Sequence, residues 1–235
     1  MKKNSSGLCA FTPHPTPACC IMMRRQFSIT LLTRYVNVKA ALTAVAPCPV
    51  FLSLDRFARH PGARRLDLEA DALQILREPN AGGNSIVSEA LSMQYMHELL
   101  GAFDVVTEMR IKYWSENWKK VDYLCSLAPD CRIAVSVTRA MKFPDPAAWT
   151  ASDAMHLLKK KLFGLVVARA GVCKAQRYTK SILHIWCQTD AIAASIASVY
   201  EDVVTELGIT ENVVLVATVA ATESCIFFDD PSIFE

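Results

Sequence analysis

This chain lacks several features that would point directly to a function. Its nine cysteines form no CxxC pair, so no cysteine-based zinc site is predicted. No run reaches the roughly eighteen apolar residues that a membrane helix needs, so a soluble protein is predicted. The net charge of +2 over 235 residues is too small to indicate a nucleic-acid binder by itself. Any electrostatic signal must therefore come from local clusters of charge.

Acidic residues are absent from the first 54 positions, whereas lysines and arginines occur there. This composition is typical of a mitochondrial targeting segment, above all in MMRRQFSITLLTRYVNVKAAL, which can form a helix with one basic side. A proline-rich extension that is basic by accident is the alternative. Residues 1–60 are accordingly predicted to be a poorly ordered tail and residues 61–235 the folded domain. The expected location is the mitochondrion, or otherwise the cytoplasm or nucleus.

The remainder of the chain is rich enough in apolar residues to bury a full core, with 52% hydrophobic and 20% charged residues overall. Its hydrophobic patterns alternate between the period of a helix and the period of a strand. They predict an α/β fold with a mixed central sheet flanked by helices. Helices are expected over 66–79, 88–100, 150–170 and 189–207, and strands over 105–112, 121–127, 132–137, 181–188 and 212–220.

Two acids stand where an apolar residue would be expected in a core element. Glu89 falls in the first turn of the helix over 88–100, and Asp122 falls early in the second strand of the predicted meander. A carboxylate at a helix N-terminus also interacts favourably with the helix dipole, which is a purely structural explanation for Glu89. Asp122 follows Lys119 and Lys120 and could form an ion pair at the edge of a strand. Both acids are nevertheless candidate metal ligands.

The element order αβββαβ, with an acid on the first helix and an Asp in the second strand, resembles the PD-(D/E)XK nuclease-like superfamily. The segments GGNSIVSEALS, VDYLC, VSVTRAMKF, LLKKKLFG and ILHIW resemble the eukaryotic AAC-rich mRNA clone protein family placed within it. The resemblance covers about Leu66 to Val219. It implies a restriction-endonuclease-like core in which the helix acid and the strand Asp bind a divalent metal ion.

Carried over by position, this resemblance makes Glu89 and Asp122 the ligands of Mg²⁺ or Mn²⁺. The superfamily places an acid, a spacer and a lysine in the third strand, but this chain has Ser136 and Thr138 in those two positions. The spacing is retained and both charges are lost. Lys160 or Lys161, on the helix that follows, could supply the missing ammonium group.

Basic and aromatic residues accompany these candidates. Tyr113, Trp114 and Trp118 cluster near a turn and could stack on unpaired bases or simply pack in the protein. His184 lies in an apolar strand, where a core role is expected. The residues expected to bind nucleic acid are Arg139, Arg169, Lys174, Arg177 and Lys180.

Two functions are therefore expected. The first is a metal-dependent nuclease that hydrolyses phosphodiester bonds in DNA or RNA with a degenerate active site. The second is a catalytically inactive protein of nuclease fold that serves as a nucleic-acid-binding or ribonucleoprotein subunit. Retention of Glu89 and Asp122 favours the first function, whereas the altered third strand favours the second.

Overall fold

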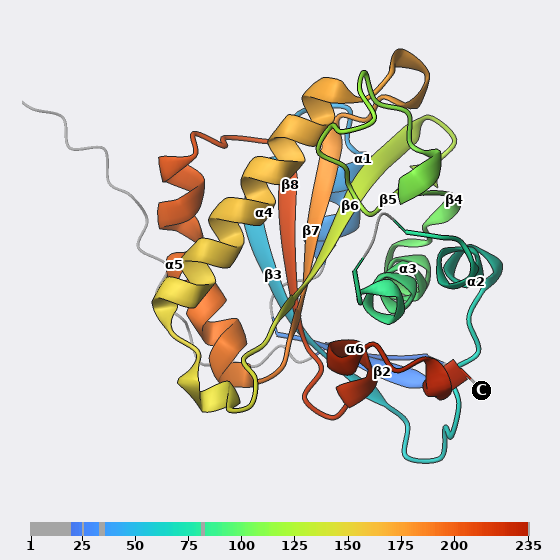
Figure 1. Cartoon of the computed structure of the whole chain (residues 1–235), viewed down its shortest axis with the longest axis vertical. Coiled ribbons are helices and arrows are strands. Elements are labelled where there is room, and N and C mark those ends of the chain that lie inside the picture. The colour runs from blue at the N-terminus through green and yellow to red at the C-terminus, as the bar shows by residue number, and fades with distance from the viewer. Residues whose placement is uncertain (1–19, 25, 33–35, 81–82, 235) are drawn as a thin grey trace, which may run out of the picture.

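An eight-stranded mixed sheet organises the protein, with the strand order β1-β2-β3-β8-β7-β6-β5-β4 (Figure 1). The computed structural model describes residues 20–24, 26–32, 36–80 and 83–234; residues 1–19 of the predicted tail lie outside these ranges. The strands are β1 (Cys20–Met23), β2 (Phe27–Leu31), β3 (Phe51–Arg59), β4 (Phe103–Thr107), β5 (Tyr123–Ala128), β6 (Cys131–Ala140), β7 (Lys180–Cys187) and β8 (Val213–Val219).

Helices cover both faces of the sheet, as predicted. In Figure 1, α4 and α5 lie on one side of the central strands and α2 and α3 on the other. Among the described residues, no helix has the length and apolar character of a membrane span. The helices are α1 (Val36–Thr43), α2 (Ala70–Arg77), α3 (Ile86–Leu100), α4 (Ala151–Gly171), α5 (Asp190–Glu206) and α6 (Ser224–Phe228), with 3₁₀ turns η1 (Glu108–Arg110), η2 (Pro146–Ala148), η3 (Lys174–Gln176) and η4 (Pro231–Phe234).

The centre of the sheet is parallel and its flanks are antiparallel. Strands β6, β7, β8 and β3 run parallel to one another. The pairs β4 with β5, β5 with β6, β1 with β2, and β2 with β3 are antiparallel. Every residue of β7 and β8 is buried, because both faces of these strands are covered. The predicted order αβββαβ is present as α3, β4, β5, β6, α4 and β7.

The first strand of the predicted meander is shorter than expected. The alternation over 105–112 predicts one long strand, but β4 ends at Thr107 and a 3₁₀ turn follows. Glu78, just after α2, accepts a hydrogen bond from Thr107 and forms an ion pair with Arg110. These contacts stabilise the turn, and Met109 is consequently half exposed instead of lying on a buried strand face.

Part of the predicted tail before residue 61 is folded into the sheet. Strand β3 pairs with β8 on one side and with β2 on the other, so residues 51–59 lie within the sheet. The acid-poor composition suggested a tail, but β3 contains Phe57, which is buried, and Asp55, which is almost fully buried. Strands β2 and β3 therefore contribute part of the folded core.

The basic segment over 22–42 is not a single helix. Strands β1 and β2 form an antiparallel pair, and α1 begins only at Val36. Strand β2 alternates between buried and half-buried residues, with Phe27, Ile29 and Leu31 facing the core. This period of two outweighs the helical pattern that the basic residues suggested.

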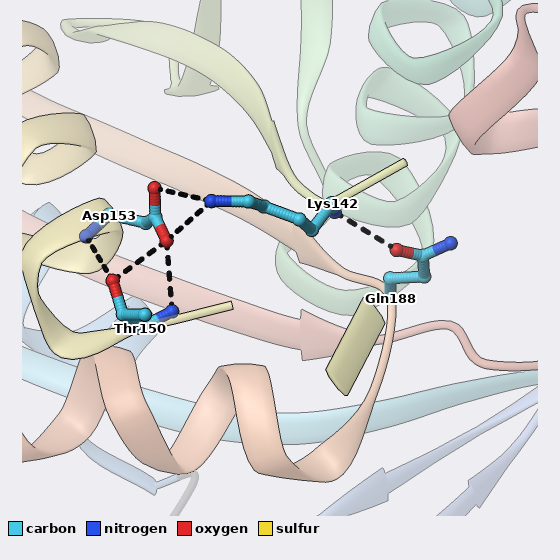
Figure 2. A network of polar contacts seen from close by, with 4 residues as sticks. All are labelled: Lys142, Thr150, Asp153 and Gln188. Carbon is cyan, nitrogen blue, oxygen red and sulfur yellow. Dashed lines mark hydrogen bonds and ion pairs between the residues drawn. The ribbon is translucent and has the colours of Figure 1, made fainter. Parts of the chain in front are cut away.

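The loop before α4 is tied to the helix by a polar network (Figure 2). Thr150 and Asp153 form a capping box, in which the Thr150 side chain accepts from the Asp153 backbone and the Asp153 carboxylate accepts from the Thr150 backbone. Lys142 donates to both Asp153 oxygens, at 3.0 and 2.9 Å, and its backbone N–H donates to Gln188. The start of α4 is thereby fixed beside the ends of β6 and β7.

His184 is a buried core histidine, as predicted. Its Nδ1 lies 2.7 Å from Ser92 Oγ on α3, and its Nε2 lies 3.1 Å from Thr218 Oγ1 on β8. Ser92 Oγ also lies 2.8 Å from the Tyr123 hydroxyl. Burial lowers the pKa of His184 to about 3, so the imidazole is neutral at physiological pH. This chain of hydrogen bonds holds α3 against the sheet.

Asp55 on β3 is the second ionisable group of this core. The Tyr95 hydroxyl on α3 donates a hydrogen bond to its Oδ2 at 2.6 Å. Burial raises the pKa of Asp55 to about 7, and the hydrogen bonds from Tyr95 and Thr218 offset only part of that effect. The folded protein consequently retains a proton on Asp55 at pH values where the unfolded chain has lost it.

Substitution Asp55→Asn should change how stability depends on pH. The raised pKa stabilises the wild type fully below about pH 4, and this contribution is lost as the pH rises toward 7. As the pH rises from about 4 to 7, the free energy of unfolding should therefore fall less steeply for the variant than for the wild type. The two slopes should differ by up to about 1.4 kcal/mol per pH unit. His184 has the opposite slope, but it is present in both proteins and cancels. If denaturant unfolding gives the same dependence of stability on pH for the variant and the wild type, the raised pKa of Asp55 is contradicted.

Removal of residues 1–59 should abolish cooperative folding. The deletion leaves one long edge of β8 unpaired and exposes the core residues that β3 covers. Circular dichroism during thermal denaturation should show a broad transition without the sigmoidal step of the full chain. A matched deletion of residues 1–19 provides the control. A sharp melt of the shorter protein would show that the sheet folds without β3.

Candidate functional site

The candidate site lies where β6 continues past the start of β5. Strand β5 begins at Tyr123, which pairs with Val135, so the rest of β6 has no β5 partner. Asp122 directly precedes β5 and takes over that role. Its Oδ2 accepts hydrogen bonds from the Val137 backbone N–H at 2.6 Å and from Ser136 Oγ at 2.9 Å. The Asp122 carboxylate thus links the start of β5 to the unpaired part of β6, and both Asp122 and Ser136 line a cleft.

Lys161 of α4 reaches the same point from the other side. Its Nζ donates to the Val137 carbonyl at 3.1 Å, so both backbone groups of Val137 are held by charged side chains. Lys160 is exposed, and Lys159 forms an ion pair with Glu206 of α5 at 2.7 Å. Because successive helix residues point in different directions, only Lys161 of the three approaches the site.

Glu89, in the first turn of α3, belongs to the same electrostatic environment. It is buried, and Ser85 Oγ donates a hydrogen bond to its Oε1 at 2.6 Å. Burial raises the pKa of Glu89 to about 8, with further contributions from the charges of Asp122 and Glu108; Lys161 acts in the opposite direction. Two acids and one lysine are therefore close enough to perturb a third acid.

The cleft lined by Asp122, Ser136 and Lys161 has a volume of about 660 Å³, within the range of natural ligand sites. Its walls come from α4, from the segment before β5 and from the 3₁₀ turn after β4. Its lining residues are Glu108, Met109, Glu116, Asn117, Trp118, Lys119, Lys120, Asp122, Ser136, Lys161, Gly164 and Leu165.

The structure brings together Asp122, Ser136 and Lys161, with Glu89 buried nearby. Thr138 lies two residues further along β6 and does not line the cleft. Glu108 was missed by sequence analysis, because the alternation around it predicted a continuing strand. The signal that could have found it is an acid in the middle of that alternating pattern.

Two residues expected to bind nucleic acid are committed to other contacts. Lys180 is 3% exposed, and its Nζ donates to the carbonyls of Ala41 and Ala44 at the end of α1, each at 2.6 Å. Arg139 donates to the carbonyls of Ile226 and Phe227 in α6, at 3.4 and 3.1 Å. Both cations satisfy carbonyls at helix C-termini, which explains why they are not available on the surface.

The other three basic residues are exposed. Arg169, near the end of α4, donates to the Thr179 carbonyl at 3.2 Å and keeps much of its side chain in solvent. Lys174 and Arg177 lie in the turn that follows α4. These residues form a smaller basic surface than the sequence predicted.

Metal-binding capacity at this site rests on carboxylate oxygens. Within the described residues, no three His, Cys, Asp or Glu side chains are grouped closely enough to hold a metal ion by themselves. Mg²⁺ commonly binds to one or two carboxylates and completes its shell with water and substrate phosphates. Of the two carboxylates expected to bind such an ion, Asp122 lines the cleft, whereas Glu89 is buried and senses the charge of Asp122.

Comparison with known proteins gives a partial match. The chain is 34% identical over 133 residues to the AAC-rich mRNA clone AAC4 protein of Dictyostelium discoideum. The match covers 54% of this chain, and the chain spans only 19% of the length of that relative. No family model matches the chain, and no solved structure matches it. The likeness agrees with the AAC-rich resemblance in the sequence and does not extend to the nuclease superfamily.

Substitution Glu89→Gln should remove part of the pH dependence of stability. Its raised pKa stabilises the wild type fully below about pH 4.5, and this contribution is lost as the pH rises toward 8. Glutamine retains an oxygen that can accept from Ser85 and does not titrate. Urea unfolding between about pH 5 and 9 should therefore give a flatter curve for the variant. If stability depends on pH in the same way for the variant and the wild type, the pKa of Glu89 is not raised in the folded protein.

Proposed function

We propose that this protein is a metal-dependent nuclease in which Glu89 and Asp122 hold Mg²⁺ or Mn²⁺ and Lys161 assists phosphodiester hydrolysis. The observation that carries the proposal is the convergence of Asp122, Ser136 and Lys161 on one cleft, with the charges of Asp122 and Lys161 close enough to shift the pKa of Glu89. The element order α3, β4, β5, β6, α4 and β7 agrees with the restriction-endonuclease-like core that the sequence resemblance implies.

Each residue has a role that follows from its contacts. Ser136 and the Val137 N–H orient the Asp122 carboxylate, and Ser85 orients Glu89. When bound, the divalent ion would act as a Lewis acid that offsets the charge of the phosphate. Lys161, a flexible ammonium group next to the carboxylates, can stabilise negative charge on the phosphate or deliver a proton to the leaving oxygen.

The altered third strand supports this assignment of the lysine. The position that holds a lysine in the resembled superfamily is Thr138, which does not line the cleft. Lys161 enters from α4 and contacts the backbone of the residue between Ser136 and Thr138. A helix lysine therefore supplies the ammonium that the strand has lost.

A catalytically inactive nucleic-acid-binding or ribonucleoprotein subunit is the second candidate. The observation that favours it is the hydrogen bond from Lys161 to Val137, because this contact already places a cation beside Asp122. In that case the protein needs no metal ion, and the exposed basic residues alone would bind phosphates. Mitochondrial localisation is proposed under either function from the acid-free composition of residues 1–54 alone, because the segment 22–42 contains the end of β1, β2 and most of α1.

Manganese should raise the melting temperature of the wild type after dialysis against a chelator. A ligand that binds only the folded state stabilises it by about 2.7 kcal/mol at one hundred times its Kd. Asp122→Asn should lose most of this shift, while its amide oxygen can still accept from the Val137 N–H. Glu116→Gln, which alters an exposed acid of the same cleft, is the control and should behave like the wild type. A wild type that does not respond to the ion would favour the inactive candidate.

Lys161→Met should reduce metal-dependent cleavage of nucleic acid by at least about a hundredfold, the usual contribution of a positioned proton donor. Lys160→Met is the matched control, because that neighbouring lysine is exposed and does not line the cleft. Initial rates on a labelled oligonucleotide provide the measurement. Equal rates for the two variants would remove Lys161 from the reaction.

A further inference from the structure

The segment from Glu108 to Val121 forms a closed loop along one wall of the cleft. The Val121 N–H donates to the Tyr113 hydroxyl at 3.0 Å, which closes the part of the loop from Tyr113 to Val121. The Trp114 N–H donates to the Gly171 carbonyl at 3.0 Å, and the Cys173 N–H donates to the Lys112 carbonyl at 2.8 Å. The loop is therefore anchored to itself and to the C-terminal end of α4.

Two glycines of α4 make room for this loop. A Cβ atom on Gly171 would lie 2.0 Å from Trp118 Nε1, and one on Gly164 would lie 2.9 Å from Lys119 Cε. Trp118 Nε1 also donates to the Val167 carbonyl at 2.8 Å. One edge of the indole is thus seated on the helix backbone, and its orientation is fixed before any ligand binds.

Large apolar side chains remain exposed on this fixed loop. Trp114 is 75% exposed, Met109 is 50% exposed, and Trp118 is 36% exposed while lining the cleft. Trp118 is held against α4, and the exposed part of each indole offers a flat surface for stacking. Because every base has an aromatic face, such a surface binds unpaired bases with little sequence preference.

Charge on the cleft walls is balanced. The lining includes three acids, Glu108, Glu116 and Asp122, and three lysines, Lys119, Lys120 and Lys161. A polyanion therefore gains little from the lining alone, and a divalent ion on the carboxylates would make the cleft positive. Phosphate binding in the cleft is expected to require the ion.

Further positive charge lies beyond Trp114. Gln176, in the turn after α4, accepts from the Lys112 N–H at 2.6 Å and donates to the Arg110 carbonyl at 3.1 Å. This contact places the exposed Lys174 and Arg177 next to the outer end of the loop. Trp118, Trp114 and these cations therefore follow one another away from the site.

We propose that the cleft binds single-stranded nucleic acid, with unpaired bases stacked on Trp118 and Trp114 and phosphates directed toward the site and toward Lys174 and Arg177. The proposal rests on the proposed function and names the class of substrate. A duplex hides the faces of its bases and needs a broad basic surface. Arg139 and Lys180 do not provide one, because both are bound to helix carbonyls.

The test compares binding of fluorescent single strands of about fifteen nucleotides, oligothymidylate and oligouridylate, with a duplex of equal length, in Ca²⁺ to limit cleavage. The single strands should bind at least tenfold more tightly than the duplex and should quench tryptophan fluorescence. Trp118→Leu and Trp114→Leu should each raise Kd at least fivefold, which corresponds to about 1 kcal/mol. Phe143→Ala is the control, an exposed aromatic residue outside the cleft, and should leave Kd unchanged.

The outcomes separate this inference from the proposed function. Tight single-strand binding with tryptophan dependence but no cleavage in Mn²⁺ upholds the inference and refutes hydrolysis. Metal-dependent cleavage of a duplex that binds as tightly as the single strands refutes the inference and leaves hydrolysis in place. If Trp118→Leu lowers the melting temperature, Trp114→Leu decides alone, because that side chain is largely in solvent. Unchanged binding by Trp114→Leu would then overturn the proposal.

Discussion

The arrangement of the site depends on the carboxylate of Asp122. Strand β6 is longer than β5, and a strand that loses its neighbour leaves backbone groups without partners. Asp122 accepts from the Val137 N–H, and Lys161 donates to the carbonyl of the same residue. Because β6 has no β5 partner at Val137, the backbone groups of this residue bind a carboxylate and an ammonium group instead. The cleft lies beside the part of β6 that extends beyond β5.

Much of the architecture could be predicted from hydrophobic patterns. Strand β8 is apolar except for Thr218, most of β7 is apolar, and α5 follows directly after its cap, Thr189. Asp122 and Glu89 were identifiable because an acid in an apolar pattern is costly unless it has a function or a partner. Selection between Lys160 and Lys161 required the structure, since a run of lysines does not reveal the rotation of its helix.

The remaining differences have physical causes that act over long distances in the sequence. Composition alone could not show that β3 pairs with β8, because the pairing joins residues far apart in the chain. The partners of Arg139 and Lys180 are carbonyls at the ends of α6 and α1, and no local pattern encodes such contacts. The position of Glu108 at the cleft could not be predicted, because it depends on a turn that contacts with Glu78, just after α2, stabilise.

The position of β3 between β2 and β8 also bears on how the chain folds during synthesis. Strand β3 leaves the ribosome early, whereas β8 is made only after β4 to β7 and their helices. Pairing between such distant segments raises the contact order and slows folding. Until β8 arrives, the edge of β3 that pairs with it over residues 51–56 lacks its native partner. The nascent protein thus carries an open strand edge from the synthesis of β3 until that of β8, a state in which chaperone binding would protect it from aggregation.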